Sequence, residues 1–178
     1  MRDHFLLRRD LMLAHWAAAA VVVHIIEATL PAAGPWFKPG LANIFTIVAF
    51  FQLGFRAAIA VTMIRIVVAS LVLGTFLSPT FLLSFSGAAA ALLIIGTAVP
   101  LKPHLGPVGF SVLAALAHMG GQVVVAAYVI IGHSGLLMIL PWVLTISWIT
   151  GLFNGLAAFL ILERIKRYDG WRNPSING

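Results

Sequence analysis

The sequence predicts an all-α integral membrane protein, a six-helix transmembrane bundle with both termini in the cytoplasm. Of the 178 residues, 61% are hydrophobic and only 9% are charged. A soluble domain carries about a quarter charged residues because it needs a solvated surface, so lipid must cover most of this chain. The other two observations are the spacing of the apolar segments and the distribution of lysine and arginine.

Six apolar segments follow one another, and a helix crosses the hydrocarbon core in about 20 residues. The triplet Gly54-Phe55-Arg56 divides a run that is too long for one helix. We expect one membrane domain, residues 11–162, between an amino-terminal segment, 1–10, and a polar, partly loose tail, 163–178. The expected helices are Leu11–Leu30, Leu41–Leu53, Ala57–Leu73, Phe81–Val99, Val108–Ile131 and Leu136–Leu162.

The positive charges predict the orientation in the cell (inner, cytoplasmic) membrane. With the amino terminus inside, only Lys38 falls on the outer side and Arg65 within a span, and cytoplasmic segments carry the excess of lysine and arginine. A cleaved signal peptide is the competing interpretation of residues 1–34, disfavoured by the length and polar content of the apolar stretch. The basic residues on the predicted inner side are Arg2, Arg8, Arg9, Arg56, Lys102, Arg164, Lys166, Arg167 and Arg172.

The segment Leu41–Leu53 is too short to span. At about 1.5 Å per residue it reaches about 20 Å, against a hydrocarbon core of about 30 Å. Its amino terminus should therefore start below the outer surface and point its free N–H groups and positive dipole end into a cavity. With Lys38 beside it, this arrangement predicts an anion-binding site.

Counting along each span places several polar side chains between mid-membrane and the outer face. Ionisable residues inside spans are costly, face the bundle interior and are functional candidates by default. A shared depth predicts a shared, outward-facing ligand pocket. Its candidate residues are Glu27, Lys38, Asn43, Arg65, His118 and Gln122.

Structural roles compete with ligand binding at these positions. Arg65 could form an internal ion pair with Glu27 that fixes helix packing. His118 alone would be a packing residue, but Gln122 follows one turn later on the same face. Asn154 lies too far inward for the pocket and is expected to bond across helices.

The sequence favours a non-enzymatic protein. It holds no phosphate loop, nucleophile elbow or paired carboxylates, and no basic stripe for nucleic acid. It contains no cysteine, and His24, Glu27 and His118 lie on different helices without metal-ligand spacing. We therefore expect no catalytic residue, no metal and no cofactor.

Long stretches resemble one known family. "KPGLANIFTIVAFFQLGFRAAIAVTMIRIVVASLVLGTFLSPTFLLSFSG", "ALAHMGGQVVVAAYVI" and "LPWVLTISWITGLFNGLAAFLI" are similar to the Gx transporter family, also called heptaprenyl diphosphate synthase component I. The resemblance runs from about Glu27 to Glu163, and most pocket candidates fall within it.

This resemblance implies a bundle like the substrate-binding S components of energy-coupling-factor transporters. In those proteins the loop after the first helix, here Pro31–Gly40, covers an outward pocket. A small-residue face on the first helix, here Ala14 and Ala18, contacts the transmembrane coupling subunit. ATPases of that coupling module would then supply the energy.

Three functions stay open. The leading hypothesis is a membrane component that captures a small, anionic or amphipathic ligand in the outward-facing pocket and depends on a partner for energy. The second is an accessory membrane subunit in isoprenoid diphosphate or quinone biosynthesis. The third is a structural subunit of a larger membrane complex, with the polar pocket holding its helices together.

Overall fold

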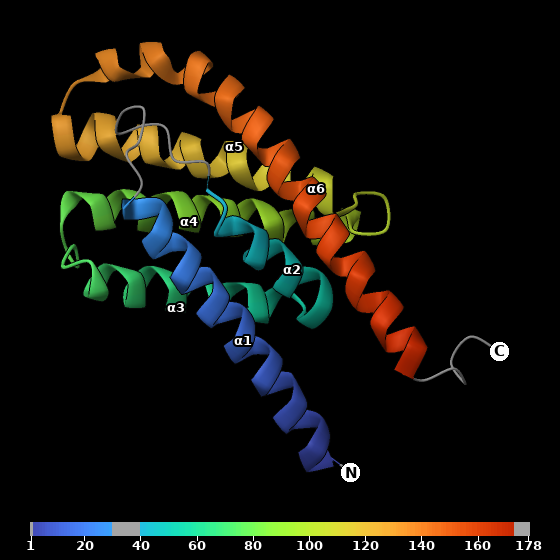
Figure 1. Ribbon diagram of the computed structural model, residues 1–178. Coiled ribbons are helices and arrows are strands. Elements are labelled where there is room, and N and C mark those ends of the chain that lie inside the picture. The colour runs from blue at the N-terminus through green and yellow to red at the C-terminus, as the bar shows by residue number, and fades with distance from the viewer. Residues whose placement is uncertain (1, 30–39, 173–178) are drawn as a thin grey trace.

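The computed structural model describes residues 2–29 and 40–172, and these residues form a bundle of helices without strands (Figure 1). Five segments are long and apolar enough to cross a membrane, while one apolar helix is shorter. The all-helical prediction with one short segment is therefore confirmed, and the length and apolar composition of the five long helices indicate a multi-pass membrane protein. The helices are α1 (Arg2–Thr29), α2 (Asn43–Leu53), α3 (Phe55–Val72), α4 (Pro79–Ala98), α5 (Pro107–Val125) and α6 (Leu140–Arg172).

The two ends of the bundle differ in what they carry. The start of α1 and the end of α6 lie toward the same end, together with the connections from α2 to α3 and from α4 to α5 (Figure 1). The connections from α3 to α4 and from α5 to α6 lie at the opposite end, which we call the distal end. This alternation matches the up-and-down order expected from the apolar segments.

The short helix α2 lies at the centre of the bundle. It contacts α1, α3, α5 and α6, and an apolar helix that is covered on all sides is a core helix. Its side chains join the main hydrophobic cluster, in which the ring of Phe50 packs edge to face with Phe51 and at a tilt against Phe110. The buried residues of α2 are Thr46, Ile47, Val48, Ala49 and Phe50.

The break between α2 and α3 is a single residue, Gly54. Its backbone has φ 91° and ψ 178°, a region that is nearly closed to residues with a side chain. Its N–H still donates to the carbonyl oxygen of Phe50 at 3.1 Å. The expected break in the triplet Gly54-Phe55-Arg56 is confirmed, and α3 begins immediately after the glycine.

The last helix is longer than expected. A 3-10 segment, Ser134–Ile139, precedes α6, and α6 then continues to Arg172. The helix therefore does not end at Leu162 as expected, and the first ten residues of the tail, 163–172, are helical. The segment is polar but rich in good helix formers, and Lys166 pairs with Glu163 at 3.2 Å one turn apart. A helix that is already nucleated propagates through such residues.

Replacing Gly54 with alanine tests the break. We expect Gly54→Ala to destabilise the protein by about 1–3 kcal/mol, because alanine resists this backbone conformation. The control is Gly120→Ala, inside α5 with open space around the added carbon. Thermal unfolding in detergent compares the two variants, and equal midpoints would contradict the role assigned to Gly54.

Candidate functional site

The amino-terminal end of α2 is bound by a carboxylate from α1. The side chain of Glu27 accepts hydrogen bonds from the backbone N–H of Leu41 at 2.6 Å and of Ala42 at 3.2 Å. Glu27 is buried, with 7% of its surface exposed. A carboxylate at this position satisfies free N–H groups and complements the positive end of the helix dipole.

This contact corrects the expected anion site at the start of α2. The next two N–H groups are also used, since Asn43 donates to Gly40 at 2.9 Å and Ile44 to Leu41 at 3.0 Å. The helix terminus is thus filled from within the protein, and a ligand would have to displace Glu27 to reach it. Lys38, the cation expected beside it, lies outside the described residues.

The opposite end of α2 is bound by two cations. Arg9 donates to the carbonyl oxygen of Leu53 at 3.5 Å, and Lys102 donates to that of Phe50 at 3.4 Å. The ammonium group of Lys102 also lies 4.6 Å from the ring centroid of Phe50 and 5.0 Å from that of Phe51. Partial burial lowers the pKa of Lys102 from its usual value. Both ends of α2 therefore carry the charge that its dipole favours.

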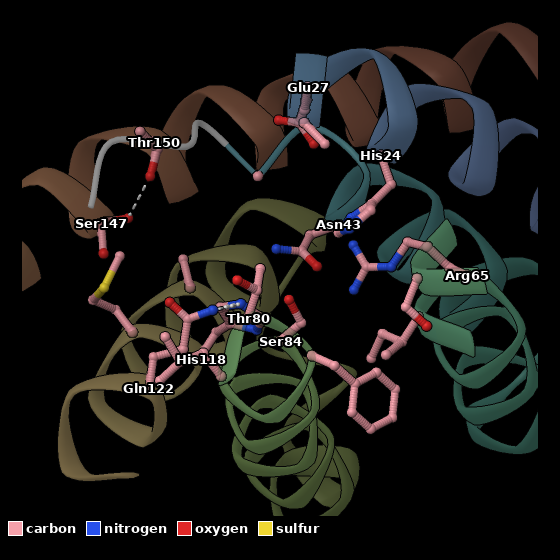
Figure 2. A pocket seen from close by; sticks show the side chains of 18 of the residues that line it. His24, Glu27, Asn43, Arg65, Thr80, Ser84, His118, Gln122, Ser147 and Thr150 are labelled. Atoms are coloured by element: carbon pink, nitrogen blue, oxygen red, sulfur yellow. Dashed lines mark hydrogen bonds between the residues drawn. The ribbon is translucent and has the colours of Figure 1, made fainter. Parts of the chain in front are cut away.

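A cavity of about 400 Å³ lies in the distal half of the bundle, lined by side chains from all six helices. Figure 2 shows polar groups on every side of it, with the guanidinium group of Arg65 pointing inward near Asn43. Most of the residues that line it are polar. They are His24, Glu27, Asn43, Arg65, Ser70, Thr75, Thr80, Ser84, His118, Gln122, Ser147, Thr150 and Asn154.

The described pocket candidates therefore meet at one place. Glu27, Asn43, Arg65, His118 and Gln122 come from four helices, yet all of them border the same cavity. The shared depth counted along the sequence thus corresponds to a shared space. Their ligand-binding role stays a prediction.

Arg65 is the charged group of the cavity without a bonded partner. It is 3% exposed, and within the described residues its Nε makes no hydrogen bond. No ion pair joins Arg65 to Glu27, so the alternative of a structural pair between them is not formed. The carboxylate is turned to the start of α2 instead, although its charge still acts on Arg65. An unpaired buried charge is costly, and this cost favours an anion in the cavity.

His118 and Gln122 form a second polar group. Their Nε2 atoms lie 3.0 Å apart, and the Nδ1 of His118 is buried without a partner. The expected common face is confirmed. Gly87 of α4 lets both side chains approach, because a Cβ there would lie 2.8 Å from Gln122 and 2.9 Å from His118.

Asn154 lies at the cavity, which corrects its expected position further inward. Its Nδ2 donates to the carbonyl oxygen of Gly40 at 3.2 Å, so this bond joins α6 to the segment ahead of α2 and not to a helix as expected. Asn154 lies about 21 Å along α6 from the start of that helix, which is why it was expected too far inward. The segment that contains Gly40 also lies deep in the bundle, because α2 starts there. Asn154 therefore reaches both Gly40 and the cavity.

Several hydroxyl groups of the cavity were not among the expected site residues. Thr80 of α4 and Ser147 and Thr150 of α6 border it. Counting residues along each span would also have placed these three in the distal half of the bundle. The count does not show whether a side chain faces the cavity or the lipid, however. Thr150 also donates to the carbonyl oxygen of Ser147 in its own helix, 3.2 Å away.

The face expected to contact a coupling subunit lies on α1. Ala14 and Ala18 are both exposed, whereas Ala17 and Ala20 on the other side are buried. The small-residue pair is thus free of the intramolecular core. Its contact with a partner stays a prediction.

Comparison with known proteins gives one family. The family model of heptaprenyl diphosphate synthase component I matches residues 16–161. This range contains every described residue that borders the cavity. Neither the search of curated proteins nor the search of solved structures gave a match.

Changing the charge of Glu27 tests its contact with α2. We expect Glu27→Gln to destabilise the protein by about 2 kcal/mol, because the amide loses the charge and turns an NH₂ group toward a backbone N–H. The control is Glu163→Gln, which removes an exposed ion pair of little weight. Unfolding in detergent would refute the role of Glu27 if both variants lost equal stability.

Proposed function

Since the chain belongs to the heptaprenyl diphosphate synthase component I family, we propose that it is a membrane component that binds a small anionic or amphipathic molecule in an outward-facing cavity. The observation that supports this most is the buried, unpaired Arg65 inside a polar space of about 400 Å³. Ligand cavities have this size. A charge held without a partner inside a membrane span is a functional feature by default.

The orientation follows from the charge distribution. The start of α1, the start of α3 and the connection from α4 to α5 lie toward the end of the bundle opposite the distal end (Figure 1). These segments carry Arg8 and Arg9, Arg56, and Lys102, respectively. Cytoplasmic segments carry such charges, so the cavity opens toward the exterior. The protein would then take its ligand from outside the cell.

Transport would require a second protein. The sequence holds no nucleotide-binding motif, so the energy must come from a partner, and a coupling subunit with its ATPases would supply it. The exposed pair Ala14 and Ala18 offers a close-packing surface for that subunit.

The family name favours a second candidate. A "component I" of heptaprenyl diphosphate synthase implies a partner subunit, and the protein could serve as the membrane part of an assembly that makes or hands on isoprenoid diphosphates. Co-purification separates the two, because a coupling ATPase and a soluble prenyltransferase are different proteins. A structural subunit of another complex would retain a large apolar partner and no small molecule.

Thiol labelling tests the orientation. The chain has no cysteine, so a single cysteine substitution introduces the one thiol that the reagent can label. In intact cells we expect a membrane-impermeant reagent to label Ser84→Cys, in the cavity, and to label Lys102→Cys only after permeabilisation. The reverse pattern would contradict an outward-facing cavity.

Native mass spectrometry tests the binding role. We expect the gently solubilised protein to retain a small molecule that Arg65→Gln loses. Arg56→Gln removes an exposed arginine from the start of the same helix, and it should retain the molecule. Equal occupancy in all three proteins, or an empty parent protein, would refute the proposed function.

A further inference from the structure

We propose that the cavity takes a small, hydrophilic monocarboxylate, bound through Arg65, and not an isoprenoid diphosphate. This inference rests on the proposed binding function and names the chemical class of the ligand. It depends on the charge balance of the cavity, the geometry of its cation, its polarity and its size.

The charge balance favours a single negative charge. Among the described residues that border the cavity, Arg65 and Glu27 carry the full charges. The carboxylate of Glu27 is bound to the start of α2, whose dipole contributes about half a positive charge. A monoanion on Arg65 brings the sum to only about half a negative charge. A diphosphate would leave an excess of buried negative charge, which is costly without more cations.

The guanidinium group also favours a carboxylate over a phosphate monoester. Its planar fork matches the two oxygens of a carboxylate. A phosphate monoester offers nearly the same acceptor geometry but carries about −1.5 to −2 charges at neutral pH. Figure 2 shows the guanidinium group directed into the cavity near the amide of Asn43, which can add a hydrogen bond to the same carboxylate.

The walls of the cavity indicate a hydrophilic ligand. Ligand pockets are lined mostly by apolar side chains, whereas half of the residues that line this one carry a hydroxyl, amide or imidazole group. Across from Arg65, the pair His118 and Gln122 can bind a second polar group, and Thr80 and Ser84 lie between these two sides (Figure 2). An isoprenoid chain would leave these polar groups without partners, at a cost for each.

The size of the cavity agrees with its polarity. A space of about 400 Å³ lies in the lower part of the range of ligand pockets. A chain of seven isoprene units is several times larger. The ligand therefore has the size of a hydroxy acid, an amino acid derivative or a small heterocyclic acid.

Matched acids and amides test the inference. The purified protein is titrated with small monocarboxylates, nicotinate among them, with the matching carboxamides, and with inorganic pyrophosphate and isopentenyl diphosphate, while the unfolding temperature is followed. We expect at least one acid to raise the midpoint, and its amide to leave it unchanged. Arg65→Gln should weaken binding of that acid by about 10- to 100-fold, the range for lost charge-assisted hydrogen bonds.

Two variants keep the test decisive if Arg65→Gln folds poorly. Arg65→Lys keeps the charge without the fork and should bind the acid more weakly than the parent but more tightly than the glutamine variant. Arg56→Gln should bind as the parent does. Equal affinity of the parent and both Arg65 variants for the acid would overturn the inference.

The outcomes also separate this inference from the proposed function. Stabilisation by pyrophosphate or isopentenyl diphosphate and by no carboxylate would overturn the inference and support the second candidate function. If mass spectrometry identifies the retained molecule as neutral or multiply charged, the proposed binding function stands and the inferred ligand class is wrong. A parent protein that retains no molecule and responds to no probe would refute both.

Discussion

The hydrogen bonds from Leu41 and Ala42 to the carboxylate of Glu27 are the interaction on which the site depends. A helix as short as α2 cannot place both of its ends in water when the middle is buried on all sides. Its free N–H groups must then find an acceptor inside the protein. The carboxylate of α1 supplies it, and the start of α2 can stay deep in the bundle. The cavity occupies the space above this deep start.

The same interaction explains why Arg65 is unpaired. Glu27 would be its natural partner, but the carboxylate is used by the backbone ahead of α2. The two groups still interact through space, and the cation remains available to a ligand. Among the described residues, Arg65 is thus a buried charge for which no bonded partner is found, and neutral donors and acceptors surround it. In the function proposed above, such a site would select its ligand by charge and size.

The charges at the other end of α2 complete this arrangement. Arg9 and Lys102 reach the last carbonyl groups from separate parts of the chain. A helix with a carboxylate at its start and cations at its end is stabilised as a dipole. Because α1 supplies one charge at each end of α2, the position of α1 is tied to both the cavity and the opposite end of the bundle.

The sequence alone determined the helical membrane class, the short second helix and the common depth of the polar residues, because apolar length and the spacing of glycine and proline are local properties. It also indicated Arg65, His118 and Gln122, since polar groups in apolar segments are rare. Only the tertiary structure decided which partner each group takes. The capture of Glu27 by the backbone and the bond from Asn154 to Gly40 depend on how deep α2 starts and which faces meet, and these follow from packing between segments far apart in the chain.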